Sequence, residues 1–327
     1  MNIRLTSIVA FLAVLLTAAN AGATSFNSLY SFGDSLSDGG SSNSAVTSIY
    51  KLLGDNCDPN HPCPPYSGGH YSNGNVAVEY LANSILPAGG TFNNYAVSGA
   101  TTGIGNYGDG GNAGTPGVYG LPGMAKEIAL YSALSGGIAD PNALYFIWGG
   151  ANDFLTGDSA TSAAQNIALY VSELAAAGAK HFLVPNLPDL GLTPYVKSVP
   201  GLVPVATAFS SDFNTELATQ LGNLSTLLPA TDIVQFDTFS FFNDLSNNPS
   251  KYGFSNTVAQ NACLSSVMAV CINPAEHIYW DGFHPTTQAD ALIATEFAIA
   301  IPEPGVIALL AVSLIVFSAA GSQRRKR

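Results

Sequence analysis

One stretch sets the architecture expected for this chain: Leu29-Tyr30-Ser31-Phe32-Gly33-Asp34-Ser35-Leu36-Ser37-Asp38. Its first four residues form a short, largely apolar run that predicts a β-strand. Gly33 then opens a turn, so that Ser35 follows directly on the end of the strand. A serine in that position is exposed at the rim of a sheet, where a base from a distant part of the chain can take its proton.

Short strand-like runs alternate with longer helical segments along the rest of the chain. Further strands are predicted at residues 92–97, 143–148, 181–184 and 233–236. Helices are predicted at residues 76–85, 160–177, 206–228 and 288–300. Such alternation indicates a parallel sheet with helices on both faces and right-handed crossovers. We therefore predict a single α/β domain with three α/β/α layers around a mostly parallel, doubly wound, flavodoxin-like sheet.

Three predicted strands are each followed by a residue suited to a catalytic rim. Ser35, Gly99 and Asn152 come just after strands, and ligands of doubly wound sheets bind beyond the carboxyl ends of the strands. Residues 101–123 are rich in glycine and lack periodicity. We interpret them as a mobile loop over the cleft rather than a phosphate cradle, because G-x-x-x-x-G-K-[ST] is absent.

A serine nucleophile needs a base, and one of the five histidines has a suitable partner. His284 lies three residues after Asp281 in a turn. The carboxylate can bond one imidazole nitrogen and leave the other for Ser35. Alone, this spacing is more typical of a surface Asp–His pair; the serine motif reverses that preference in favour of catalysis.

Attack of a serine nucleophile on a carbonyl group also generates an oxyanion, which is stabilised by donors that already point at it. The backbone N–H groups of Ser35 and Gly99 and the side-chain amide of Asn152 are suitable donors. The alternatives are a plain strand-end turn at Gly99 and a loop-capping role for Asn152. H-E-x-x-H is absent, so a metalloprotease is not indicated, and no motif calls for a metal or cofactor.

In order along the chain, four segments resemble the GDSL family of lipases and esterases, also called SGNH hydrolases. They are Gly33-Asp34-Ser35-Leu36, Val97-Ser98-Gly99-Ala100, Gly150-Ala151-Asn152-Asp153 and Asp281-Gly282-Phe283-His284. Other segments resemble the branch with bacterial lipases, phospholipases and thermolabile haemolysins: Tyr71-Ser72-Asn73-Gly74, Val184–Gly191 and Tyr252-Gly253-Phe254. The resemblance implies a serine hydrolase of lipid or short-chain carboxylic esters that forms an acyl-enzyme. It also implies catalytic Ser35, Asp281 and His284 and an oxyanion hole of Ser35, Gly99 and Asn152. We expect Asp34, Asp38 and Asp153 to hold these loops and to take no chemical step.

The N-terminus, residues 1–23, is predicted to be a secretory signal peptide. Arg4 precedes an apolar run from Ile8 to Leu16, and small residues follow as Ala19-Asn20-Ala21 or Ala21-Gly22-Ala23. The alternative is an uncleaved anchor helix, although the run is short for a membrane span.

The C-terminus, residues 301–327, combines three sorting features. Pro302-Glu303-Pro304 precedes an uncharged apolar run that ends at Gly321, and basic residues follow from Arg324 to Arg327. This combination resembles the PEP-CTERM signal of Gram-negative, biofilm-forming bacteria. It implies transient membrane association, cleavage by an exosortase-type enzyme and delivery to the cell surface or extracellular matrix. An ordinary tail anchor is the alternative.

Between these ends, the predicted hydrolase domain at residues 24–300 is strongly acidic. It has 21 carboxylates against five lysines, a net charge of −16 with histidine neutral. The negative electrostatic potential of such a domain repels nucleic acid and favours a neutral or zwitterionic substrate.

The four cysteines form two local pairs, which we predict to be the disulfides Cys57–Cys63 and Cys263–Cys271 because export permits oxidation. A zinc site is disfavoured by the spacing. The short loops closed suggest that each bridge secures a surface loop rather than the fold.

Two other functions remain open at this point. A carbohydrate O-acetylesterase would suit delivery to a polysaccharide matrix. A matrix adhesin on an inactive hydrolase scaffold is a candidate from another class, although an intact set of Ser35, Asn152, Asp281 and His284 disfavours it.

Overall fold

The computed structural model describes residues 26–40 and 57–301. The predicted signal peptide and almost all of the predicted sorting segment lie outside these residues. In the described ranges, none of the helices combines the length and apolar character needed to cross a bilayer.

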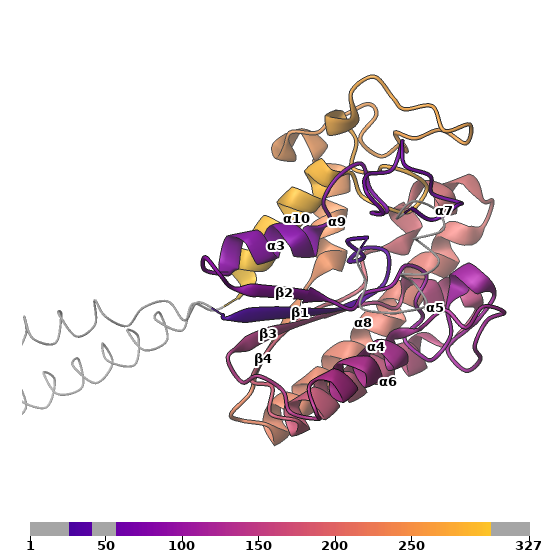
Figure 1. Ribbon diagram of the computed structural model, residues 1–327. Helices are drawn as coiled ribbons and strands as arrows, with labels where there is room; N and C mark the ends of the chain where they lie inside the picture. Colours follow the sequence, from indigo (N-terminus) through magenta and orange to yellow (C-terminus); the bar gives the residue numbers. More distant parts are fainter. Residues whose placement is uncertain (1–25, 41–56, 302–327) are drawn as a thin grey trace, which may run out of the picture.

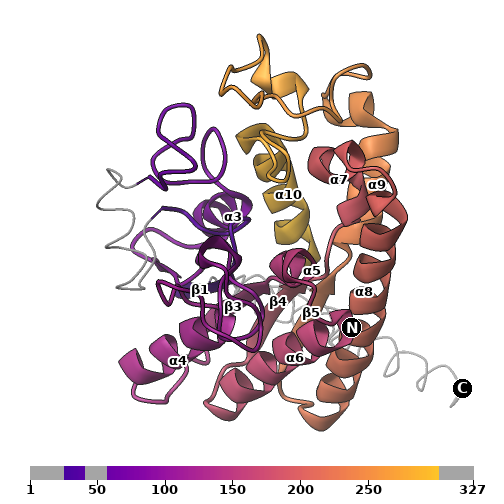
Figure 2. The same cartoon turned by 90° about the vertical axis from the view of Figure 1, so that its right-hand side faces the viewer.

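Five parallel strands form one sheet in the order β2-β1-β3-β4-β5 (Figures 1 and 2). The strands are β1 Ser28–Gly33, β2 Thr91–Asn94, β3 Ala143–Trp148, β4 His181–Pro185 and β5 Asp232–Phe236. This order is the flavodoxin-like one, in which the chain first adds a strand on one side of β1 and then winds to the other. The predicted fold class is therefore confirmed.

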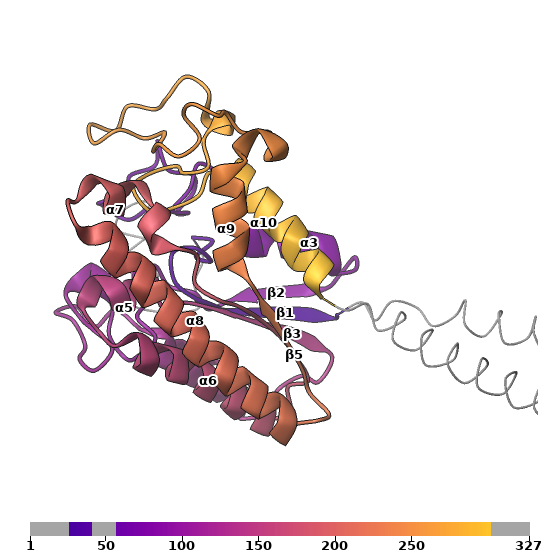
Figure 3. The same cartoon turned by 180° about the vertical axis from the view of Figure 1, so that it is seen from behind.

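Helices cover both faces of the sheet (Figures 1 and 3). One layer consists of α3 Ala77–Ile85, α9 Thr238–Asn247 and α10 Thr287–Ala300. The other consists of α4 Met124–Leu134, α6 Ala160–Ala176 and α8 Leu202–Leu227. Shorter helical segments join these elements: α5 Ala151–Thr156, α7 Pro194–Ser198, and the 3₁₀ turns η1 Tyr107–Asp109, η2 Leu190–Leu192, η3 Pro249–Tyr252 and η4 Pro274–Glu276.

The central strand β3 supplies side chains to a core on each side of the sheet. Tyr145 and Ile147 pack in the core under α4, α6 and α8. Leu144, Phe146 and Trp148 pack in the core under α3, α9 and α10. Successive side chains of a strand point to opposite faces, so the continuous apolar run of β3 reflects burial on both sides.

Two predicted boundaries differ from the structure by more than one residue. The strand predicted at 92–97 ends at Asn94, because the Asn94 side chain accepts a hydrogen bond from the Ala96 N–H and turns the backbone. The helix predicted from residue 206 begins at Leu202 and includes Pro204. Proline is tolerated there because the N–H groups of the first turn have no partner within the helix.

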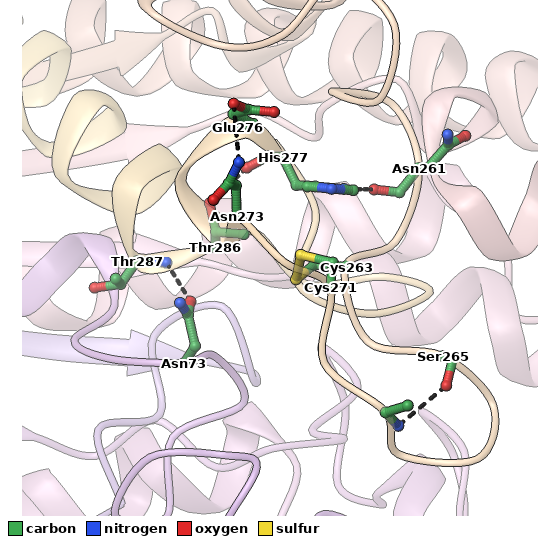
Figure 4. Close-up of a disulfide and its surroundings, with 11 residues drawn as sticks. Asn73, Asn261, Cys263, Ser265, Cys271, Asn273, Glu276, His277, Thr286 and Thr287 are labelled. Atoms are coloured by element: carbon green, nitrogen blue, oxygen red, sulfur yellow. Dashed lines mark hydrogen bonds between the residues drawn. A yellow bond between two sulfur atoms is a disulfide. The ribbon is translucent and has the colours of Figure 1, made fainter.

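Both predicted disulfides, Cys57–Cys63 and Cys263–Cys271, are formed. Figure 4 shows the second bridge closing the loop that contains Ser265. The two loops are also in contact with each other, which the sequence did not indicate: Cys63 and Cys271 pack against one small buried cluster formed by Tyr66, Cys263, Leu264 and Trp280. The two loops meet because this cluster gives each an apolar surface to cover.

Candidate active site

Residues from four separate loops line one pocket at the carboxyl ends of the strands. Figure 2 views this end of the sheet, with α5 and α7 in the foreground. Ser35 follows β1, Gly99 lies beyond β2, Asn152 begins the turn of α5 after β3, and His284 precedes α10. The pocket has a volume of about 580 Å³. The parallel topology brings these loops together because every strand ends at the same edge.

Ser35, His284 and Asp281 form a continuous hydrogen-bonded chain. His284 Nε2 lies 2.8 Å from Ser35 Oγ. On the other side of the ring, Nδ1 lies 2.8 Å from Asp281 Oδ2 and 2.9 Å from Oδ1. A carboxylate only accepts hydrogen bonds, so Nδ1 carries the proton and Nε2 accepts the bond from the Ser35 hydroxyl. This arrangement can move a proton from serine to imidazole.

The turn between Asp281 and His284 fixes the carboxylate. Asp281 Oδ1 accepts hydrogen bonds from the backbone N–H groups of Phe283 and His284, each at 2.8 Å. Asp281 is 9% exposed and His284 is 8% exposed. The shielded contact is therefore stronger than the same pair would be on the surface.

Charge coupling shifts the pKa values of the pair in the directions a catalytic base needs. Burial alone would raise the pKa of Asp281, but attraction to His284 and hydrogen bonds from His284 and Phe283 lower it to about 2. Burial alone would lower the pKa of His284, but the charge and hydrogen bond of Asp281 raise it above the usual value. Asp281 therefore stays ionised at neutral pH and favours the imidazolium form of His284.

The aspartates expected to hold the loops do so. Asp38 accepts hydrogen bonds from the N–H groups of Gly40 and Ser98, each at 2.9 Å, and so joins the loops after β1 and β2. Asp153 accepts the N–H of Thr102 at 2.9 Å and its hydroxyl at 2.7 Å. Asp34 accepts the N–H of Leu36 at 3.0 Å.

Sequence reasoning missed Glu127, a buried acid on α4. Its Oε2 accepts the Gly33 N–H at 2.9 Å and its Oε1 accepts the Val97 N–H at 3.2 Å. One side chain thus joins the backbones that lead into Ser35 and Gly99. Burial raises the pKa of Glu127 well above its usual range. The signal available in the sequence was a lone carboxylate among apolar residues of α4.

Backbone conformation and space both require glycine at position 99. Its φ is +78°, which other residues rarely adopt. An added Cβ would lie 2.3 Å from Asn106 Oδ1. Gly99 lines the pocket.

Asn152 lies on the same wall, and the Asn152 Nδ2 donates to Ala100 O at 3.0 Å. This bond orients the amide and uses one of its two N–H donors. The structure thus combines the loop-capping contact considered for Asn152 with a position in the pocket that suits a substrate donor.

The remaining pocket wall is mostly apolar, with a polar patch from the first disulfide loop. Its apolar and aromatic side chains include Leu36, Val97, Leu121, Phe154, Leu155, Leu190, Val196, Phe242, Tyr279 and Phe283. The polar patch consists of Asp58, Asn60 and His61, which sequence reasoning did not assign to the site. Among the described residues, no group of three His, Cys, Asp or Glu side chains is arranged to hold a metal ion.

The glycine-rich segment predicted as a loop over the cleft borders the pocket through Tyr107, Gly108 and Leu121. Internal bonds shape it: the Gly105 N–H donates to Asn112 O at 3.1 Å, and the Ile104 N–H donates to Ala113 O at 3.0 Å. Several of its glycines touch backbone so closely that a Cβ would not fit; at Gly103 the added atom would lie 1.9 Å from Ala113 O.

Comparison with known proteins identifies the family. The family model for GDSL-like lipase/acylhydrolase matches residues 29–297. A GDSL esterase/lipase of Arabidopsis thaliana is 27% identical over 311 residues, which cover 84% of this chain and 89% of that protein. The phosphatidylcholine-sterol acyltransferase of Aeromonas hydrophila is 30% identical over 244 residues, which cover 73% of this chain and 65% of that protein.

Among solved structures, a lipolytic protein of the G-D-S-L family from Veillonella parvula aligns with a TM-score of 0.42 at 16% identity, covering 83% of this chain and 96% of that chain. The family match spans all four loops of the pocket and supports hydrolysis of ester bonds. The chain therefore belongs to the GDSL-like lipase/acylhydrolase family.

Proposed function

We propose that this protein is an exported serine hydrolase that cleaves carboxylic esters through an acyl-enzyme. The observation that carries this proposal is the 2.8 Å contact between Ser35 Oγ and His284 Nε2, with Asp281 on the far side of the imidazole. Of the functions considered, ester hydrolysis is the one that uses every residue of this chain of hydrogen bonds.

In the first half of the reaction, Ser35 Oγ attacks the ester carbonyl carbon while His284 Nε2 takes the hydroxyl proton. The Ser35 and Gly99 N–H groups and the Asn152 amide stabilise the oxyanion. His284 then gives its proton to the departing alkoxide, and an acyl-Ser35 ester remains. In the second half, His284 deprotonates a water molecule that attacks this ester, and the proton returns to Ser35 Oγ as the acid leaves.

The pocket supports a lipid or other acyl ester as the substrate. Its walls are mainly apolar, which suits an acyl chain. The exposed side chains Tyr107, Val118 and Tyr119 extend apolar surface over the neighbouring loop. The acidic domain favours a neutral or zwitterionic head group. One relative is named phosphatidylcholine-sterol acyltransferase, which makes phosphatidylcholine a sensible test substrate.

Two measurements on the purified domain test the proposal. A fluorophosphonate probe should label the protein, and peptide mapping should place the adduct on Ser35. Turnover of p-nitrophenyl esters from acetate to palmitate, of phosphatidylcholine and of acetylated polysaccharide then defines the substrate. Preference for acetylated polysaccharide would indicate a carbohydrate O-acetylesterase instead of an enzyme that acts on lipid or short-chain esters. Absence of both labelling and turnover would favour a matrix adhesin on an inactive hydrolase scaffold.

The pH dependence of turnover should report the coupled pair. His284 accepts a proton only when neutral, and its pKa is raised, so kcat/KM should fall as pH falls through a midpoint above about 6.5. Asp281→Asn removes the charge that raises this pKa and should move the midpoint to lower pH while reducing kcat, though less severely than Ser35→Ala. A midpoint that is the same in both proteins would contradict the assignment of Asp281.

The sorting features at both ends predict processing in the native compartment. In a host with an exosortase, mass spectrometry of the surface fraction should show chains that begin near residue 24 and lack the basic C-terminus. The two disulfides fit export, because such bonds persist in oxidising compartments. Surface-exposed chains that end at Arg327 would count against the processing signal.

A further inference from the structure

A tyrosine outside the loops discussed so far contacts the proposed catalytic acid. The Tyr66 hydroxyl donates a hydrogen bond to Asp281 Oδ2 at 2.7 Å, and the two residues are 215 positions apart in the chain. The same oxygen lies 2.8 Å from His284 Nδ1. Asp281 Oδ2 thus joins the imidazole to a donor from a distant segment.

The backbone contacts of Asp281 hold the other carboxylate oxygen. The backbone N–H groups of Phe283 and His284 both bond to Oδ1, so neither of them restrains Oδ2 directly. Tyr66 does restrain Oδ2. Because Oδ2 faces His284 Nδ1, the same restraint sets the direction of the imidazole toward Ser35.

We propose that Tyr66 is a positioning residue that holds Asp281, and through it His284, in the geometry required for proton transfer from Ser35. This inference rests on the proposed hydrolase function. It adds a member to the hydrogen-bonded chain that neither the motifs nor the spacing of the sequence indicated.

Packing holds Tyr66 in place. The residue is 5% exposed. Its ring makes edge contacts with His61 at 5.0 Å and with Trp280 at 6.2 Å between ring centroids. The Tyr66 N–H also donates to Pro62 O at 3.1 Å, inside the first disulfide loop. A ring with these neighbours has little freedom to move its hydroxyl away from Asp281.

The two disulfide loops converge on this contact. Tyr66 lies three positions after Cys63, whose bridge to Cys57 closes the first loop. In the second loop, the Leu264 N–H donates to Trp280 O at 2.6 Å, directly before Asp281. Tyr66, Cys263, Leu264 and Trp280 form one buried cluster. The bridges therefore brace the side of the site that holds the acid.

The hydroxyl acts as a fixed donor over the working pH range. Burial and the neighbouring charge of Asp281 raise the pKa of Tyr66 far above its usual value, so the phenol keeps its proton. A donor on Oδ2 draws charge from the carboxylate and weakens its pull on protonated His284. Removal of the donor should therefore raise the pKa of His284 and also loosen its orientation.

Tyr66→Phe tests the proposal because it removes the hydroxyl and keeps the ring. We expect kcat on p-nitrophenyl butyrate to fall about five- to twenty-fold with little change in KM, since a misoriented base slows the chemical step. We also expect the acid-side midpoint of kcat/KM to move to higher pH. A kcat equal to that of the parent, or a midpoint that stays or falls, would overturn the proposal.

Tyr131→Phe is the matched control. Tyr131 is 3% exposed, and its hydroxyl bonds to the Tyr145 hydroxyl at 2.9 Å in the core under α4. This variant also loses one buried hydrogen bond, and it should show no change in kcat or in the pH midpoint. If both variants changed kcat and midpoint equally, the effect of Tyr66 would be general destabilisation and the proposal would fail.

The Asp281→Asn background separates this inference from the hydrolase proposal. Tyr66 acts through Asp281, so adding Tyr66→Phe to Asp281→Asn should change kcat less than about two-fold. Independent, multiplicative losses would refute the positioning role while the hydrolase proposal stood. Full activity of Ser35→Ala would instead reject the hydrolase mechanism itself.

Discussion

Ser35→Ala and His284→Ala are each expected to lower kcat for ester hydrolysis by a factor on the order of 10⁵–10⁶, because nucleophile and base act as a unit. Without Ser35 the acyl group has no acceptor on the protein. Without His284 the hydroxyl keeps its proton and is a weak nucleophile. The double variant should be no worse than either single variant, and initial rates with p-nitrophenyl butyrate measure all three.

A second Asp–His contact provides the control for this loss. His181 Nδ1 lies 3.0 Å from Asp232 Oδ2. These are the first residues of β4 and β5, so the contact is at the amino ends of the strands and the pocket is at their carboxyl ends. His181→Ala should keep the parent rate. All variants should have a melting temperature close to that of the parent, which separates loss of chemistry from loss of folding. A folded Ser35→Ala protein with the parent rate would refute the assignment of Ser35.

Asn152→Ala should lower kcat by a factor on the order of 10²–10³, about 3–4 kcal/mol, if its amide is one of the oxyanion donors. The nucleophile and base remain, so fluorophosphonate labelling at Ser35 should persist at a reduced rate. KM should change little, since the missing bond is strongest in the transition state. Steady-state kinetics on p-nitrophenyl butyrate give both parameters.

The control for Asn152 is another asparagine that bonds a backbone carbonyl. Asn243 Nδ2 donates to Phe239 O at 2.9 Å within α9, and Asn243→Ala removes a bond of the same kind as the bond from Asn152 to Ala100. This variant should be catalytically silent. If Asn152→Ala reduced kcat by no more than Asn243→Ala, Asn152 would be a loop cap alone.

The strands were the most predictable elements, because a strand that is buried on both faces has a continuous run of apolar residues. The run 143–148 was predicted with the bounds that β3 has in the structure, since all of its side chains are buried apolar groups. The predicted end of β2 was wrong because the hydrogen bond from the Ala96 N–H to the Asn94 side chain turns the backbone, although the apolar pattern of the sequence continues. Helices α4 and α9 were missed. Helix α4 follows Gly123, which supplies no side-chain cap, whereas the Asp237 cap of α9 is a signal that sequence reasoning overlooked.

The site residues also divide into those that the sequence could predict and those that it could not. Ser35, Gly99 and Asn152 were predictable because each follows a strand, and parallel strands end at one edge. Asp281 and His284 were predictable because their contact is local, three residues apart in a turn. The disulfides were also predictable, since each joins neighbours in the chain. Sequence spacing carries information only about contacts of this local kind, or about contacts that topology enforces.

Glu127 and Tyr66 belong to the other class. Glu127 reaches Gly33 across 94 positions, and Tyr66 reaches Asp281 across 215 positions. Neither periodicity nor a motif in the sequence indicates such pairs, because these contacts depend on how a helix and a disulfide loop pack against the sheet. By itself, the sequence determined the α/β class, the strand-end loops and the local Asp–His pair. Only the tertiary structure decided which distant donors and acceptors hold those loops in place. Buried polar groups must be hydrogen-bonded, and their partners are set by how the folded chain packs rather than by their separation in the sequence.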